Sequence, residues 1–507
     1  MRPENTSDNK ISACCRREYT FILLLCIIGA VRVFIFGAAF PPLNNIDEYC
    51  HFDLVWKYSK GHLPRSAIEN FNKESAELFV LYRTPEYLLK PKNFVGGAFP
   101  PPTWKTPNIQ KSERFAQSVA DSQQGKNHET WSFPVYYAAA GLWCAAGRFF
   151  GIAEGNLLYW IRFLNVPLFA LLVWVSYLVA KTFFPNDYFL RISLPLMVAF
   201  FPQDSFYSIS NDSLSPLLFG IAFLMLLQIF FEDKSYRYHV LAGLAVAVVV
   251  LTKISNITIL LPAGIIVLLK AKQYLLKKNF ANIIPLVLLS AAAVMPIGLW
   301  CLRNYITFGS FTGVAETLKY KTWTIKPLSE IWNHPIFTAA GLFHFLTELA
   351  KTFWRGEIVW QGKTIASPAM DLFYVVSTAV LITVAAISLV LSRNKTDRQT
   401  IFALEISFFV VIASVLFLVA LSIRYNFGEC YFPTQNEPYF TTGRLISGSI
   451  ILFLLIYLNG LRRLFPKSAN RILPLLVVII IAAVITCSEI LLSLDVFKSQ
   501  YNWFHLK

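Results

Sequence analysis

The sequence is poor in charged residues. Only 15% of its 507 residues are Asp, Glu, Lys or Arg, whereas 55% are hydrophobic and 15% are aromatic. Soluble domains usually carry about a quarter charged residues, so a deficit spread along the whole chain excludes an ordinary soluble protein. Most apolar surface must face lipid or other apolar helices. The sequence therefore predicts an all-α polytopic membrane protein.

The short motifs of common soluble catalytic sites are also missing. There is no glycine-rich phosphate loop, no HExxH and no GxSxG, so a nucleotide site of the usual soluble kind is not indicated. The eight cysteines form no CxxC and no ligand-like cluster. Four of them lie in or beside apolar segments and are expected to be small buried hydrophobes: Cys26, Cys144, Cys301 and Cys487. We expect no bridge between Cys50 and Cys430.

The formal net charge of +15 is not arranged for nucleic acid. The Lys and Arg residues occur in short clusters between apolar runs, as cytoplasmic loops require, rather than on one contiguous basic face. We therefore expect a bilayer and no nucleic acid among the partners.

Apolar runs of about 20 residues, the length that crosses hydrocarbon, recur along the chain and predict about eleven or twelve transmembrane helices. They lie near 20–40, 157–180, 190–207, 213–231, 239–254, 256–271, 283–302, 368–392, 400–423, 444–461 and 472–493. The expected parts are a cytoplasmic tail (1–19), an uncleaved first helix (20–40), an outer loop with catalytic acids (41–131), a transmembrane core (132–302), an aromatic outer loop (303–367) and C-terminal transmembrane helices (368–507).

The run 132–150 decides the topology. Five basic loops can all be cytoplasmic only if eleven segments cross and 132–150 is re-entrant or interfacial. A twelfth crossing at 132–150 would put several of these loops outside, and we favour the first arrangement. The loops carry Lys181/Arg191, Lys234/Arg237, Lys270/Lys272/Lys277/Lys278, Arg393/Lys395/Arg398 and Arg462/Arg463/Lys467/Arg471.

That topology gathers the polar segments on one face. It places 41–131, the turn Asp204–Asp212, the junction Lys253–Asn256, 303–367 and 424–443 on the outer side. Polar groups distant in the chain that converge on one face of an apolar bundle are typical of an extracytoplasmic active site.

The strongest candidates follow the first span. Asp47 and Glu48, with His51 three residues later, have the residue types that bind a divalent metal or accept a proton. A helix N-terminus with acids favouring its dipole explains the two acids equally well. His128 and Glu129 precede the entry Ser132-Phe133-Pro134-Val135-Tyr136-Tyr137 and could join a metal site.

Further candidates lie at the outer ends of later spans. Asp212 either caps a helix or acts in the site; an acid at a membrane boundary costs more than a neutral cap. Lys253 either binds an anion or snorkels. Arg303, beside Asn304, and Arg444 lie where the positive-inside rule disfavours arginine, so an anionic partner such as phosphate is indicated.

In this order, the segments resemble the GT-C superfamily of membrane glycosyltransferases, which includes protein O-mannosyltransferases and the aminoarabinose transferase acting on lipid A. The similarity is close to a group of bacterial multi-pass proteins related to that superfamily. The matching features are the first-loop acids Asp47 and Glu48, the entry at Pro134-Val135-Tyr136-Tyr137, Arg162 through Lys181 to Pro185, Asp212, Lys253, Arg303-Asn304-Tyr305 and Gly443-Arg444. One proline of the family's entry motif is absent here.

The resemblance implies a GT-C-like helical bundle with a helical first outer loop. It implies a bacterial inner-membrane enzyme that moves a sugar from a polyprenyl phosphate to a glycan, lipid or protein acceptor on the extracytoplasmic face. Asp47, with Glu48 as substitute, would be the base. The donor would contact Arg303, Lys253, Arg444, Asn304 and Tyr136. A divalent metal, Mg²⁺ or Mn²⁺, would find ligands among Asp47, Asp212, His51, His128 and Glu129.

Two other functions stay open. A transporter or flippase of a lipid-linked or small anionic solute would also use many spans with buried cations, although no internal repeat relates two halves of the chain. A ~90-residue outer loop is also more than a transporter ordinarily needs. A non-catalytic scaffold is the third possibility, although every candidate residue is present.

Overall fold

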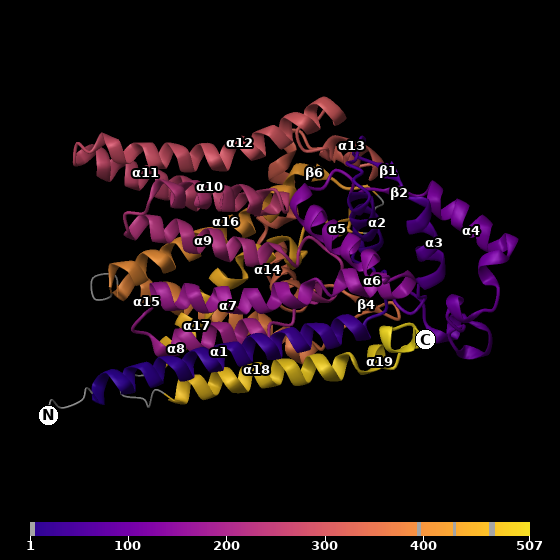
Figure 1. Cartoon of the computed structure of the whole chain (residues 1–507), viewed down its shortest axis with the longest axis horizontal. Coiled ribbons are helices and arrows are strands. Elements are labelled where there is room, and N and C mark those ends of the chain that lie inside the picture. Colours follow the sequence, from indigo (N-terminus) through magenta and orange to yellow (C-terminus); the bar gives the residue numbers. More distant parts are fainter. Residues whose placement is uncertain (1–5, 393–396, 429–431, 466–471, 507) are drawn as a thin grey trace.

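The computed structural model describes residues 6–392, 397–428, 432–465 and 472–506. Helices dominate this part of the chain, and most of their axes run along one common direction (Figure 1). The predicted all-α polytopic architecture is confirmed.

Eight helical segments of the described residues are long and apolar enough to cross a membrane, and three shorter apolar helices lie among them. The long segments contain α1 (Thr6–Ala39), α6 (Glu154–Arg162) continued by α7 (Asn165–Phe183), α11 (Leu260–Leu276), α12 (Ile283–Phe308), α15 (Pro368–Ser392), α16 (Arg398–Arg424), α17 (Ile450–Arg463) and α18 (Ile472–Leu492). The shorter helices are α8 (Tyr188–Ala199), α9 (Ser215–Phe231) and α10 (Tyr236–Val250). Together these are eleven apolar helical segments, eight of them long enough to span; that all eleven cross stays a prediction.

The run 132–150 forms α5 (Pro134–Phe149), which is not among these segments. It packs against α2 (Glu48–Ser59) of the first outer loop. Gly141 permits this contact, because a Cβ there would lie 3.0 Å from the Cβ of Tyr58. This packing attaches α5 to the first outer loop, and the interfacial topology of 132–150 stays a prediction.

The two ends of the bundle differ in character. Helices α7, α9, α11, α15 and α17 all end at the same end of the bundle as the start of α1, and we call it the basic end (Figure 1). Four of the basic residues expected there, Arg393, Lys395, Lys467 and Arg471, fall outside the described residues. The opposite end, the loop end, carries the long polar segments.

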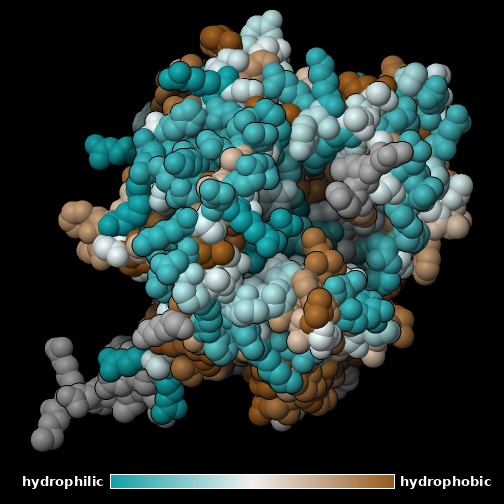
Figure 2. All heavy atoms as spheres, turned by 90° about the vertical axis from the view of Figure 1, so that its right-hand side faces the viewer, coloured by the Kyte–Doolittle hydropathy of each residue, from teal (hydrophilic) through white to brown (hydrophobic). Residues whose placement is uncertain are grey.

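The loop end is built from short helices and two-residue strand pairs. Its helices are α2, α3 (Lys73–Tyr82), α4 (Glu113–Gln124), α5, α13 (Val314–Tyr320), α14 (Ala339–Arg355) and α19 (Leu494–Phe497). Three antiparallel pairs tie it together: β1 (Glu69–Asn70) with β2 (Lys126–Asn127), β3 (Thr324–Ile325) with β6 (Tyr425–Asn426), and β4 (Val359–Trp360) with β5 (Lys363–Thr364). Figure 2 shows hydrophilic side chains over much of this end, with apolar ones along its edges.

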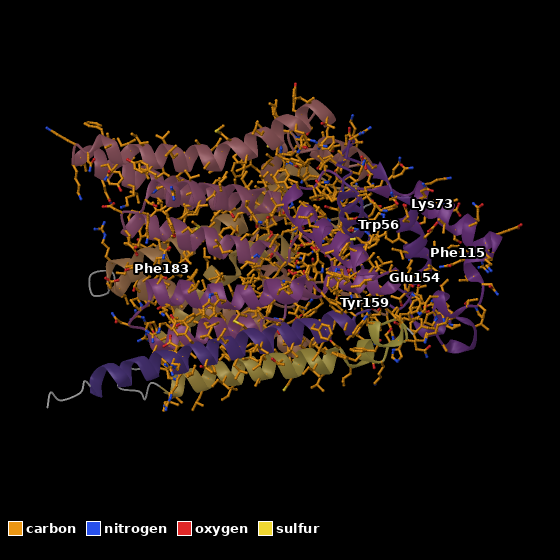
Figure 3. The ribbon with its side chains drawn as sticks, viewed as in Figure 1. Trp56, Lys73, Phe115, Glu154, Tyr159 and Phe183 are labelled. Carbon is orange, nitrogen blue, oxygen red and sulfur yellow. The ribbon has the colours of Figure 1, made fainter. Side chains whose placement is uncertain are left out.

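The core of the bundle surrounds α17, whose residues from Ile450 to Leu461 are all buried. By contrast, α12, α15 and α18 expose many apolar side chains, as helices that face lipid do. Side chains fill the space between helices along the bundle (Figure 3). Phe183, at the basic end of α7, is fully buried, and the hydroxyl of Tyr159 donates to the Phe40 carbonyl at 3.2 Å.

Candidate functional site

Asp47 lies in the turn between α1 and α2 at the loop end. It occupies the N-cap position of α2, but its side chain makes no capping hydrogen bond, and its φ of 62° is left-handed. Instead its two oxygens face other segments of the chain. Oδ1 lies 3.5 Å from Nε2 of His128, and Oδ2 lies 3.6 Å from Nη2 of Arg444. The side chain of Asp47 therefore does not cap α2.

His128 and Glu129 complete a group that could hold a metal. One ligand atom each from Asp47, His128 and Glu129 lie within 4.8 Å of one another. Residue 128 is positioned by its neighbour, because Asn127 pairs with β1 and its Nδ2 donates to the Cys50 carbonyl at 2.9 Å. Two carboxylates and an imidazole offer oxygen and nitrogen ligands, the set that suits Mn²⁺ or Zn²⁺ better than Mg²⁺.

His128 is oriented from its far side as well. Its Nδ1 lies 3.6 Å from Sγ of Cys50, and the ring of Tyr320 stacks on it with centroids 6.2 Å apart. With Nδ1 occupied, Nε2 faces Asp47 and is the nitrogen available to a metal. Cys50 is a buried free thiol, and Cys430 lies outside the described residues.

Asp212 forms a second centre, in the buried segment before α9. Its carboxylate is fully buried and contacts Lys253, which follows α10. It also accepts from Nη1 of Arg444 at 3.1 Å and from the hydroxyl of Ser210 at 2.9 Å. Asp212, Lys253 and Arg444 therefore meet in the structure, although they are separated by as many as 232 positions in the chain.

Arg444 connects the two centres. It lies in the 3₁₀ segment Gly443–Ser449 that leads into α17. Its guanidinium faces three carboxylates: Asp212 at 3.1 Å, Asp47 at 3.6 Å and Glu357, whose Oε2 lies 3.5 Å from Nε. Nε is buried and has no hydrogen-bond partner. The guanidinium therefore retains an unused donor within the site.

The charges of the site are unequal. Asp47, Glu129, Asp212 and Glu357 supply four carboxylates, against two permanent cations, Arg444 and Lys253. Burial by itself would raise the pKa of Asp47, but the hydrogen bond and charge of His128 and the charge of Arg444 hold it well below its usual range.

The pKa values of Asp212 and Glu357 shift in opposite directions. Burial opposes ionisation of Asp212, yet the charges of Lys253 and Arg444 lower its pKa to about 2. For Glu357 burial prevails over Arg444 and raises the pKa. Asp47 and Asp212 are thus fixed negative charges, and the surplus of acid favours a bound cation.

Glu48 does not join the site. Both of its oxygens are taken by Arg162, with Nε at 2.9 Å and Nη2 at 2.6 Å, and it also accepts from the backbone N–H groups of Asn44 and Ile209. The side chains of Glu48 and Arg162 are each only 1% exposed. The pair joins the start of α2 to α6 and serves the fold.

Four more predicted residues are placed outside the two centres. Arg303 donates to the Pro64 carbonyl and lies over the Trp300 and Phe308 rings, while Asn304 is buried and donates to the Phe311 carbonyl at 3.3 Å. His51 is buried, with Nδ1 2.8 Å from the Tyr137 hydroxyl. Tyr136 is fully buried near Asp212, which contributes to its electrostatic surroundings.

The metal prediction is corrected accordingly. Among the described residues, the group that could hold an ion comprises Asp47, His128 and Glu129, and it includes neither Asp212 nor His51. The cations around Asp212 take its oxygens, and the Tyr137 hydroxyl takes Nδ1 of His51.

Sequence reasoning missed two acids, Glu357 and Asp204. Asp204 is 5% exposed, and one of its carboxylate oxygens, Oδ1, is buried without a partner. Its Oδ2 accepts from the backbone N–H groups of Glu357 and Ile358, each at 2.6 Å. Neither acid has a flanking motif; the only local signal is Gly356, directly before Glu357.

The buried position of Asp204 predicts a pH-dependent stability. Burial raises its pKa from 3.8 to about 7. The folded state then binds this proton more tightly than the unfolded state, so this group makes the protein less stable as pH rises from about 4 to 7, by about 1.4 kcal/mol per unit of difference in pKa. Asp204→Asn removes the effect. We expect wild-type protein to lose more thermal stability than the variant between pH 5.5 and pH 8; equal losses would contradict the assignment.

Comparison with known proteins places the chain among membrane proteins. No curated protein matches it. The solved structure of ArnT from Cupriavidus metallidurans bound to undecaprenyl phosphate aligns with 95% of this chain and 74% of that one, with 13% identity and a TM-score of 0.45. An Archaeoglobus fulgidus oligosaccharyltransferase in complex with Zn and sulfate aligns with 94% of this chain, with 14% identity and a TM-score of 0.41.

The two alignments differ in how much of the other protein they cover. The second covers only 53% of the oligosaccharyltransferase, so this chain spans about half the length of that protein. The model of one family, described as predicted membrane proteins of the DUF2142 type, matches residues 26–431. The chain therefore belongs to the DUF2142 family of membrane proteins.

Proposed function

We propose that this protein is a membrane glycosyltransferase. It moves a sugar from a polyprenyl-phosphate donor to an acceptor at the loop end, which faces away from the cytoplasm. One observation carries the proposal: Arg444 joins the partly buried Asp47, His128 and Glu129 group to the buried Asp212 and Lys253 pair. These residues come from five separate segments and meet at the end of the bundle opposite the basic loops.

Asp47 is the proposed proton acceptor. Its side chain is 33% exposed, against 0% for Asp212 and 21% for Glu357, so it is the most accessible of the three acids around Arg444. The acceptor oxygen attacks the anomeric carbon, the bond from that carbon to the phosphate oxygen breaks, and the acceptor proton passes to Asp47. Its low pKa makes Asp47 a weak base, which suits a proton transfer that follows formation of the new bond.

Cations in the site meet the charge of the leaving phosphate. Arg444 supplies a guanidinium, which suits phosphate through paired hydrogen bonds. Lys253 adds a second positive charge beside Asp212. Fixed donors of this kind act most strongly in a site that excludes water.

A divalent metal fits the partly buried group of Asp47, His128 and Glu129. Asp47, Glu129 and Nε2 of His128 would hold it, and its charge balances the surplus of carboxylates around Arg444. When bound, such an ion supplies Lewis-acid stabilisation of a phosphate oxygen. The residues of the chain keep their own tasks: His128 orients Asp47, and Arg444 fixes its second oxygen.

Metal binding is predicted to depend on His128. Titration of purified protein with Mn²⁺, followed by electron paramagnetic resonance, should show affinity falling by more than about tenfold in His128→Ala, since even losing a hydrogen-bond partner of a metal ligand costs that much. His62→Ala is the matched control, because His62 is also at the loop end but contacts Glu69. Equal affinity in wild type and His128→Ala would remove the metal from the proposal.

The function itself is tested with donor lipids. Purified protein is incubated with a panel of radiolabelled polyprenyl-phosphate sugars, with and without EDTA. Loss of lipid-linked label to water or to an added acceptor supports a transferase, and its arrest by EDTA supports the metal. Accumulation of solute in proteoliposomes without a covalent product would instead establish a transporter.

A further inference from the structure

The turn 356–359, between α14 and β4, connects three segments of the candidate site. Its Glu357 side chain faces Nε of Arg444 at 3.5 Å. Its backbone is held by Asn45, two residues before Asp47: Nδ2 donates to the Glu357 carbonyl at 3.3 Å, and Oδ1 accepts from the Val359 N–H at 2.9 Å. Movement of this turn would therefore displace neighbours of both Asp47 and Arg444.

Asp204 holds the turn from the other side. A single carboxylate oxygen accepts from two consecutive backbone N–H groups, those of Glu357 and Ile358, each at 2.6 Å. Gly356 makes this approach possible: its φ is +83°, and a Cβ there would lie 1.9 Å from Cγ of Asp204. The backbone is thus shaped around the Asp204 carboxyl group.

Gln203, the preceding residue, fixes the end of α14. Its Nε2 donates to the carbonyls of Thr352 and Phe353, in the last turn of the helix, at 3.1 and 2.8 Å. The hydroxyl of Thr352 in turn accepts from the N–H of Gly443 at 3.0 Å. The chain entering Arg444 is therefore tied to the same support as the turn.

Burying a carboxyl group to hold a loop costs free energy. A neutral Asn would accept the same two hydrogen bonds through its carbonyl oxygen and would avoid burying a carboxylate charge, with its amide nitrogen in the unpartnered place of Oδ1. The cavity next to Asp204, lined by polar residues such as Tyr207, Arg355 and Glu489 and by apolar ones, holds only about 50 Å³, which is room for a few waters and not for a sugar. Asp204 thus acts through the turn rather than on a ligand.

We propose that Asp204 is a positioning residue, which locks the turn 356–359 and through it sets Glu357, Arg444 and Asp47 relative to one another. The consequence for catalysis rests on the proposed transferase function. The positioning itself does not, because it is measurable in protein that turns nothing over.

Hydrogen–deuterium exchange tests the positioning directly. In Asp204→Ala, exchange should rise by about tenfold or more at the amides of Glu357 and Ile358, as expected when a buried hydrogen bond is lost. It should also rise in the peptides containing Asn45–Asp47 and Gly443–Arg444. Asp204→Asn should preserve protection in all three, because its carbonyl oxygen accepts both bonds. Faster exchange confined to 357–358 would overturn the proposal.

The matched control is Asp397→Ala. Asp397 Oδ2 likewise accepts from two backbone N–H groups, those of Gln399 and Thr400, but at the basic end. This variant should change exchange at the start of α16 and leave the three site peptides protected.

Once a donor is known, the kinetics of transfer provide a separate test of the role of Asp204. Asp204→Ala should lower kcat by about a hundredfold, in line with the cost of misplacing a reacting group, with a small change in KM. Asp204→Asn should restore kcat to within a few fold. Loss of kcat in Asp204→Asn with the turn still protected would overturn positioning as its role. Absence of turnover in wild-type protein would count against the transferase and leave the exchange result to decide on Asp204.

Discussion

Replacing Arg444 by alanine is expected to lower sugar transfer by about a hundred- to a thousandfold, the usual cost of removing a preorganised donor from a developing negative charge. Arg444 is the only residue described that contacts Asp47, Asp212 and Glu357 together. Without Arg444, Asp212 keeps only Lys253 as its cationic partner, and Asp47 keeps only His128. The measurement is kcat/KM for donor and acceptor in purified protein.

One further variant separates the effect of charge from that of geometry, and a second variant is its control. Arg444→Lys keeps the positive charge but cannot span three carboxylates with one planar group, so it should recover only part of the lost rate. Arg424→Ala is the control, because Arg424 is exposed at the end of α16. A folded Arg444→Ala variant with wild-type transfer would remove Arg444 from the mechanism.

The largest effect on stability is expected at Glu48. Glu48→Gln leaves the Arg162 guanidinium buried with an uncompensated charge, and breaking such a pair typically costs about 3–5 kcal/mol. The variant should unfold at a clearly lower temperature in detergent, as measured by differential scanning fluorimetry.

The double variant Glu48→Gln with Arg162→Met tests the cause. It removes both charges, so it should regain part of the lost stability if the penalty comes from the unpaired arginine. Lys498→Met is a surface control, because the exposed Lys498 and Asp495 pair should contribute little. A Glu48→Gln variant as stable as wild type that has lost transfer would instead place Glu48 in the reaction.

Much of the site could be predicted because its residues lie where apolar spans end. Asp47, Asp212, Lys253 and Arg444 are all charged side chains at span boundaries, where burial is costly, and charge asymmetry among the loops assigned them to one face. The same asymmetry favours an interfacial 132–150 although its composition is apolar, and this topology stays a prediction; the structure shows that α5 packs on α2.

The parts of the site that could not be predicted from the sequence depend on the direction in which side chains point. Asp47 and Glu48 are neighbours in sequence, yet the left-handed backbone at Asp47 precedes the helix and Glu48 begins it, so they face different partners. No periodicity distinguishes them. Arg303 met the same span-boundary criterion as Arg444 but is held by Pro64 and two aromatic rings. Asp204 and Glu357 meet through backbone hydrogen bonds across 153 positions, for which a single sequence carries no signal.

The most direct test of the central claim is transfer by wild-type protein and by Asp47→Asn, measured side by side on the same radiolabelled polyprenyl-phosphate sugar. Asp47→Asn keeps the size of the side chain and removes the proton acceptor and its charge. The proposed function predicts that label leaves the lipid in the wild type and that the rate falls by at least about a hundredfold in the variant. Equal rates in the two proteins, or binding without any loss of lipid-linked label across the panel, would contradict it.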